Sequence, residues 1–156
     1  MTGRGPAGER GIALAVAIFA LVVIGALVAA NFFSGRVEQQ SGQNSLFARQ
    51  AAEGAETGLQ EALETLPAST LVAMPVRGAP LDLGTSSISP RVQVERQVAR
   101  LTGSLFLLRV RGTRQDAAGS SLATRALGLL LHLVPNPVGG SPLVVRLTQR
   151  SWVQLH

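Results

Sequence analysis

The chain of 156 residues contains no cysteine, no tyrosine and no lysine. Without cysteine it can form neither a disulfide nor a thiolate metal site, and an oxidising compartment is neither required nor excluded. Its two histidines, His132 and His156, have no second metal ligand or nucleophile close by in the sequence. A glycine-rich phosphate-binding loop and a metal-ligand spacing are both missing. These absences argue against an enzyme, a metal site or a cofactor, and we expect a structural, non-catalytic protein.

Charge is also absent from a long stretch near the N-terminus. Between Arg10 and Arg36 the chain runs for 25 residues without a charged side chain, and residues 12–30 are mostly Ile, Leu, Val, Ala and Phe. About 20 apolar helical residues cross the ~30 Å hydrocarbon core of a bilayer, whereas the apolar part of a cleaved signal peptide has only about 7–15. We therefore predict a leader over residues 1–11 and a membrane-spanning helix over residues 12–33.

The arginines beside this segment indicate its orientation. Arg4 and Arg10 precede it, and by the positive-inside rule they favour a cytoplasmic N-terminus. The rest of the chain is then expected to lie on the other side of the membrane.

The helical pattern continues beyond the predicted span. Small and apolar residues recur in steps of three and four over residues 48–66, while charged side chains take the other faces. We assign residues 34–66 to a polar continuation of the helix. Ser34 with Gly35 and Ser41 with Gly42 should weaken it, because a glycine in a helix interior costs about 1 kcal/mol. We expect the helix to bend or melt there.

Proline and glycine punctuate the next segment, residues 67–90, which we expect to be a linker. Over residues 91–156 the apolar period changes from about 3.6 to 2, with turns at 102–104, 116–120 and 135–142. We predict an antiparallel β-meander of three or four strands. Only the second half of the long helix can cover its apolar face, so the predicted fold class is α+β.

The charges of the helix and of the predicted sheet have opposite signs. Residues 36–66 carry five glutamates against two arginines, and residues 91–156 carry nine arginines against two acids. Glu53 and Glu56 are expected on a solvated helix face, with Arg49 placed for a local ion pair with Glu53. The alternative is that these acids meet arginines of adjacent subunits.

Three arginines, Arg109, Arg111 and Arg114, fall in one predicted strand and are interpreted as an outward basic row. A solvated face is the default interpretation, and a contact with an acidic partner is the functional alternative. No exposed aromatic residues are interleaved with them, which argues against nucleic acid as that partner.

Three segments resemble the PilX-type minor pilins of the type IV pilin superfamily. They are RGIALAVAIFALVVIGALVAA at residues 10–30, LFARQAAEGAETGLQEAL at 46–63 and RSWVQLH at 150–156. The resemblance implies a pilin-like fold, in which a long membrane helix continues into an amphipathic helix packed on a small antiparallel sheet. It also implies cleavage by a prepilin peptidase between Gly11 and Ile12, followed by N-methylation of Ile12.

One position departs from the superfamily pattern. Major pilins carry glutamate at the fifth mature residue, where it is thought to pair with the N-terminus of a neighbouring subunit, and here that residue is Val16. A subunit without this acid needs no partner above it, which suggests a place at a pilus tip or in a priming complex. Neighbouring spans would approach closely at Gly25, Ala26, Ala29 and Ala30.

The resemblance thus implies a minor type IV pilin of the bacterial inner membrane, taking part in pilus assembly or initiation with its head in the periplasm. Its partners would be other pilin and minor pilin subunits, the prepilin peptidase and the inner-membrane assembly machinery. Two alternatives stay open. One is a minor pseudopilin of a type II secretion system, although the tip subunit of that system carries a much larger inserted domain. The other is an unrelated single-pass membrane protein with a small periplasmic head.

Overall fold

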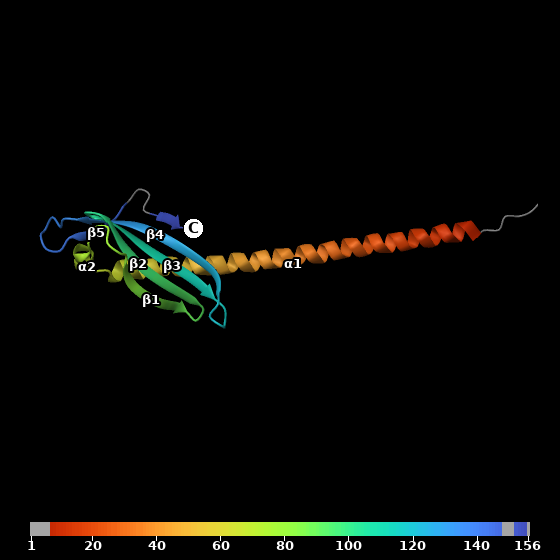
Figure 1. Cartoon of the computed structure of the whole chain (residues 1–156), viewed down its shortest axis with the longest axis horizontal. Helices are drawn as coiled ribbons and strands as arrows, with labels where there is room; N and C mark the ends of the chain where they lie inside the picture. Colours follow the sequence, from red (N-terminus) through yellow and green to blue (C-terminus); the bar gives the residue numbers. More distant parts are fainter. Residues whose placement is uncertain (1–6, 148–151, 156) are drawn as a thin grey trace, which may run out of the picture. The chain divides into compact units, whose positions relative to one another are not determined.

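The longest element is helix α1, which runs from Ala7 to Thr65 and contains 59 residues. The computed structural model describes the backbone of residues 7–147 and 152–155 (Figure 1). The helix begins five residues before Ile12, so the second half of the predicted leader is helical. It passes through Gly35 and Gly42 without a break, so the helix does not melt at these glycines. Each glycine weakens the helix by only about 1 kcal/mol, and no proline interrupts the backbone hydrogen bonds.

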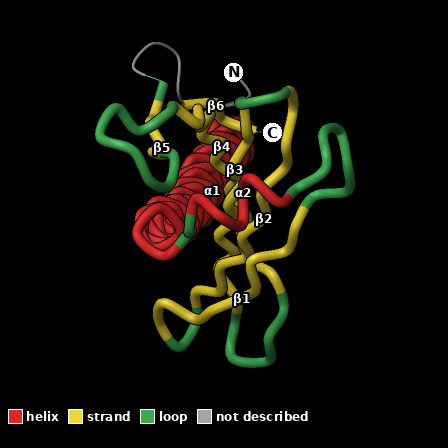
Figure 2. The backbone as a smooth tube through the Cα atoms, turned by 90° about the vertical axis from the view of Figure 1, so that its left-hand side faces the viewer, coloured by secondary structure: helices red, strands yellow, loops and turns green. Residues whose placement is uncertain are grey.

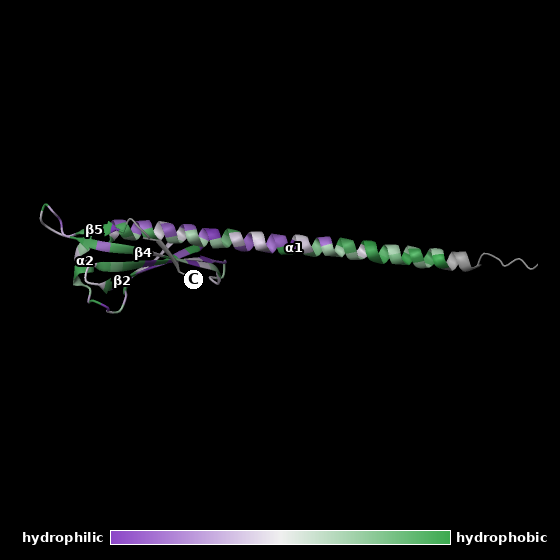
Figure 3. Ribbon diagram, turned by 90° about the horizontal axis from the view of Figure 1, so that it is seen from above, coloured by the Kyte–Doolittle hydropathy of each residue, from purple (hydrophilic) through white to green (hydrophobic). Residues whose placement is uncertain are grey.

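The chain divides into two units, Met1–Gln43 and Asn44–His156. In the first unit every side chain from residue 12 to residue 43 is exposed. Figure 3 shows that apolar residues dominate this N-terminal part of α1 and that polar residues become frequent toward its C-terminal end. Residues 12–43 of the first unit therefore form no apolar core of their own.

The second unit contains the C-terminal part of α1, a short helix α2 (Ala68–Ala73) and a six-stranded antiparallel sheet (Figure 2). The strands are β1 (Leu81–Ser89), β2 (Val92–Thr102), β3 (Leu105–Gln115), β4 (Ser121–Val134), β5 (Leu143–Arg146) and β6 (Trp152–Leu155). Their spatial order is β1-β2-β3-β4-β5, and β6 also pairs with β4. The predicted α+β class and the antiparallel pairing are confirmed, with six strands in place of three or four.

Tight turns connect the central strands where the sequence predicted them. Gly103 and Ser104 form the turn between β2 and β3. Between β3 and β4, the Asp116 carboxylate accepts hydrogen bonds from the backbone N–H groups of Ala118 (2.9 Å) and Ser120 (2.8 Å). An aspartate that bonds to the backbone two residues on is a recognised turn former.

The segment 67–90 differs from the predicted linker, because it holds both α2 and the edge strand β1. Leu71 of α2 is fully buried in the core. β1 lacks regular alternation because its pairing register with β2 shifts twice, between Asp82 and Gly84 and between Ser87 and Ser89. Such irregularities bend an edge strand and hide the period of two from the sequence.

The core of the second unit lies between α1 and one face of the sheet. Its buried residues are Ala55, Leu59, Ala62, Leu71, Met74, Val92, Val94, Val98, Phe106, Leu108, Val110, Leu129 and Leu131. Small residues let the backbones approach closely, since a Cβ on Gly54 would lie 2.5 Å from Val92 Cγ1, and one on Gly112 would collide with the Ala51 carbonyl oxygen. We call the sheet face that packs on α1 the inner face and the opposite one the outer face.

Candidate functional site

The first candidate site is the apolar part of α1. It is long and apolar enough to cross a membrane, and none of its most apolar window is buried in this chain. Ile12 and Val16 are both more than half exposed, at 68% and 61%. The predicted processing junction, Gly11 to Ile12, lies within α1.

The residues predicted to allow close helix packing lie within this apolar stretch. Ala26, Ala29 and Ala30 are exposed, and a Cβ added to Gly25 would meet no atom within 4 Å. Because helical residues three and four apart share a face, these four positions form one small-residue surface. No described part of the chain covers it.

The second candidate site is the helix face that carries Glu53 and Glu56. Both side chains are exposed, on the side of α1 opposite the buried Ala51, Ala55 and Leu59. Arg49 Nε lies 2.9 Å from Glu53 Oε1, so the predicted local ion pair is present. An exposed pair at this spacing contributes only about 0.3–0.5 kcal/mol, which leaves the face free for other contacts.

The third candidate site, the basic row on β3, is divided by the structure. Side chains alternate between the two faces of a strand, and Val110 and Gly112 face α1. Arg109 and Arg111 are therefore exposed on the outer face, whereas Arg114 has the parity of the inner face. The prediction that all three arginines form one outward row is wrong for Arg114. The sequence carries a signal for this: Arg114 lies three residues after Arg111, and an odd step along a strand leads to the opposite face.

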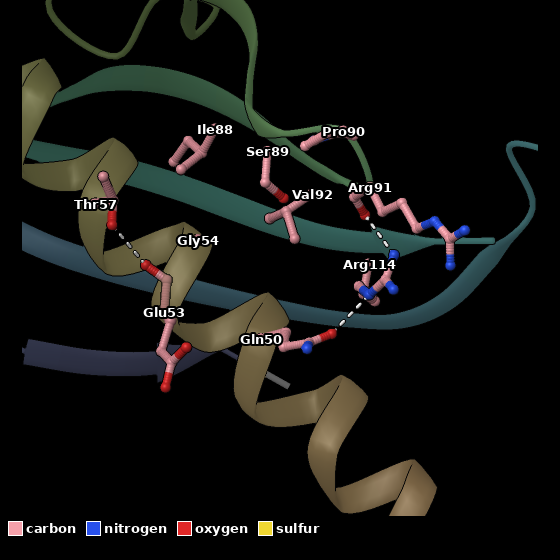
Figure 4. A pocket seen from close by; sticks show the side chains of 10 residues that line it. All are labelled: Gln50, Glu53, Gly54, Thr57, Ile88, Ser89, Pro90, Arg91, Val92 and Arg114. Carbon is pink, nitrogen blue, oxygen red and sulfur yellow. Dashed lines mark hydrogen bonds between the residues drawn. The ribbon is translucent and has the colours of Figure 1, made fainter. Parts of the chain in front are cut away.

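Arg114 instead joins β3 to α1 (Figure 4). Its Nε donates to the Gln50 side-chain oxygen at 2.6 Å, and its Nη1 donates to the Arg91 carbonyl at 3.2 Å. The guanidinium also lies 5.7 Å from the centre of the Phe47 ring. Arg114, Gln50 and Arg91 border an open pocket of about 510 Å³ beside the turn between β1 and β2. Because the guanidinium is occupied by this chain's own acceptors, we interpret the pocket as structural.

Two further arginines join elements and were not identified as such from the sequence. Arg96 has a side chain only 14% exposed and pairs with Glu61 of α1 and with the Ser86 hydroxyl of β1. Arg100 donates through Nη1 to the Val72 carbonyl at 3.2 Å and through Nε to the Gly103 carbonyl at 3.0 Å. The parity that Arg96 shares with Val92, Val94 and Val98 was the available signal in the sequence.

One residue pair with possible chemical reactivity comes together in space. Ser104 Oγ of the β2–β3 turn lies 2.8 Å from His132 Nε2 on β4. A nucleophilic serine also needs a group that orients the histidine and donors that stabilise an oxyanion. Within the described residues no carboxylate hydrogen-bonds to His132, and no three His, Asp or Glu side chains cluster as a metal site. The hydrogen bond between Ser104 and His132 therefore connects the β2–β3 turn to β4. The second histidine, His156, lies outside the described residues.

Comparison with known proteins finds no relative of this chain, since no family model, curated protein or solved structure matches it. Its class therefore rests on its own architecture. It is an α+β protein with one N-terminal helix capable of spanning a membrane and an antiparallel sheet that is uncovered on its outer face in the described residues.

Proposed function

We propose that the chain is a minor type IV pilin, a structural subunit that takes part in pilus assembly or initiation. The observation that carries this proposal is α1 itself. One unbroken helix joins an uncharged, fully exposed segment to a face that packs on an antiparallel sheet. If a loop joined the membrane segment to the sheet domain, the two would not leave the membrane as parts of one helix.

The proposed mechanism has two stages. The uncharged segment is first held in the inner membrane, with Arg4 and Arg10 on the cytoplasmic side and the sheet domain in the periplasm. A prepilin peptidase cleaves between Gly11 and Ile12. The span then leaves the lipid by packing against the spans of other pilin subunits, and the surface at Gly25, Ala26 and Ala29 allows close approach.

The proposal assigns this subunit to a tip or priming role because Val16 stands where major pilins have an acid. A carboxylate in the membrane interior requires a partner, whereas valine is compatible with lipid on every side. A subunit of this kind can start a filament without a neighbour above it.

Deletion of the gene tests the proposal. We expect the number of surface pili seen by electron microscopy to fall at least severalfold, and a plasmid copy of the intact gene to restore them. A copy with Thr85→Ala, an exposed position on β1, is the matched control and should restore them equally. Unchanged piliation after deletion would contradict the proposal. Mass spectrometry of the membrane-extracted protein tests processing, and a mature chain that does not begin at Ile12 would contradict that part.

A further inference from the structure

Two surfaces of the second unit carry charges of opposite sign. On the outer face, Arg109 and Arg111 of β3 stand beside Glu95 of β2, which lies 3.6 Å from Arg111. The acidic helix face consists of Glu53, Glu56 and Glu64, with Arg49 as its one basic residue. The outer face also carries Asp82 of β1, and Arg146 of β5 donates a hydrogen bond to Gln60 on the helix face. The difference in charge is therefore local: Arg109 and Arg111 form a positive patch, and Glu53 and Glu56 lie in a negative one.

Each surface also has a charge that its own chain does not neutralise. Glu53 is paired with Arg49, and Arg111 with Glu95. Among the side chains that the structure describes, Glu56 and Arg109 form no ion pair, and both are exposed. Each surface can accept one more ion pair without breaking an existing one.

The two surfaces lie back to back at the same level of the helix-on-sheet layer. A Cβ on Gly58 would lie 3.2 Å from Val110 Cγ1, and one on Gly112 would lie 2.8 Å from the Ala55 nitrogen. The part of β3 that carries Arg109 and Arg111 therefore packs on residues 51–58 of α1. Glu53 and Glu56 belong to that stretch and point away from the sheet.

We propose that the outer face of one copy, at Arg109 and Arg111, binds the acidic helix face of a second copy, at Glu53 and Glu56. This inference rests on the proposed function for one condition, that copies are anchored in the same membrane by the same segment. Copies that share one membrane are confined to the same surface, which raises the effective concentration at which their second units meet. The contact joins different surfaces of the two copies, and such a heterologous contact propagates into a ring or a helical filament.

Cross-linking between single-cysteine variants tests the contact directly, because the chain has no cysteine of its own. Full-length Gln60→Cys and Gln97→Cys chains with different tags are co-expressed in cells that lack pilus genes, and their membranes are treated with a short bismaleimide. Gln60 is exposed one helical turn from Glu56, and Gln97 is exposed beside Arg109, so both charges of the proposed pair remain. We expect the mixed product to form at least fivefold more than the product of either variant with itself. Val138→Cys paired with Gln60→Cys is the matched control, because Val138 is exposed in the loop between β4 and β5 and does not belong to the outer face.

Charge reversal then tests the chemistry of the contact. Adding Arg111→Glu to the Gln97→Cys chain should lower the mixed yield at least threefold, and adding Glu53→Arg to the Gln60→Cys chain should restore it. High salt should also lower it, because exposed charges are screened. Recovery by the second reversal shows that the first variant still folds.

Several outcomes would overturn the inference. One is a mixed yield no higher than the yield of the self-products, and another is a mixed yield that neither charge reversal changes. A third is a yield that rises with the anionic lipid content and does not change with Glu53→Arg, which would identify a lipid surface as the binding partner. Failure here with piliation lost on gene deletion would reject this contact and leave the proposed function standing. Cross-links in a protein whose deletion leaves piliation unchanged would support this contact and reject the proposed function.

Discussion

Single residues in the second unit are constrained most tightly where α1 meets β3. Gly112 is the closest point, because an added Cβ would collide with the Ala51 carbonyl oxygen and lie 2.8 Å from the Ala55 nitrogen. Both obstacles are backbone atoms of a helix, so they cannot rotate out of the way as a side chain could.

We predict that Gly112→Ala lowers the free energy of unfolding by about 1–3 kcal/mol, the usual cost of overpacking a filled core. Urea unfolding of the detergent-solubilised protein, followed by circular dichroism, measures the change. Gly103→Ala is the control, because a Cβ in that turn meets nothing within 4 Å. Equal stability of the two variants would show that the helix and the sheet are not in this contact.

Arg96 is a second constrained residue, because its charge lies between α1 and β1 with the side chain 14% exposed. Glu61→Gln removes the carboxylate that pairs with it and leaves a nearly buried guanidinium without its counter-charge. We expect a loss of about 1–3 kcal/mol, below the 3–5 kcal/mol of a fully buried pair because Glu61 is half exposed. Glu56→Gln on the solvated face should change the unfolding free energy by less than about 0.5 kcal/mol. A similar loss in both variants would argue against the pairing.

Within helix α1, replacing a glycine by alanine should raise stability at one position and lower it at another. Gly42 has no atom within 4 Å of an added Cβ, whereas a Cβ on Gly58 would collide with Val94 Cγ1. Gly42→Ala should therefore stabilise the local helix by about 1 kcal/mol. Gly58→Ala should destabilise the second unit.

Hydrogen exchange measures the local effect. Amides around residue 42 should exchange about fivefold more slowly in Gly42→Ala, which is about 1 kcal/mol expressed as a ratio of opening constants. Unfolding in urea reports the loss in Gly58→Ala. Unchanged exchange around residue 42 would mean that this stretch of α1 is already held by contacts other than its own hydrogen bonds.

The elements differ in how far the sequence could predict them. β3 alternates regularly between buried and less buried residues from Leu105 to Gly112, and one tight turn joins it to β4, so their pairing followed from the pattern. β1 did not, because a glycine at φ +95 in position 84 and two register shifts remove its period of two. α2 has only six residues and is held by the buried Leu71 and by the hydrogen bond from Arg100 to the Val72 carbonyl, which are tertiary contacts.

The candidate sites show the same limit. The ion pair between Arg49 and Glu53 followed from spacing on one helix, whereas Arg114 was assigned to the wrong face. A step of three residues along a strand changes the face, so Arg114 lies on the face opposite Arg111. Arg96 with Glu61, and Ser104 with His132, join residues 35 and 28 positions apart, so only the fold brings them together.

At the scale of the whole molecule, the two units are suited to different solvents. The second unit buries large apolar side chains such as Phe106, Leu108 and Leu129 in a core, while the first exposes Ile18, Leu21 and Phe32. An uncharged helix with every face exposed is stable in a bilayer, where the lipid covers its side chains and the helix satisfies its own backbone hydrogen bonds.

Charged substitutions in the middle of the apolar segment test whether it lies in a bilayer. Leu21 and Val22 lie at the middle of residues 12–30, and an arginine at the centre of a membrane helix opposes insertion by about 2.5–3.5 kcal/mol. Leu21→Arg together with Val22→Arg should therefore move most of the protein from the alkali-resistant membrane pellet to the soluble or aggregated fractions. Leu21→Ala with Val22→Ala keeps the segment uncharged and helical, and should stay in the pellet. A doubly charged variant that remains in the pellet as fully as the alanine control would show that this helix is not held in lipid, and the proposed storage of the subunit in the membrane would fail with it.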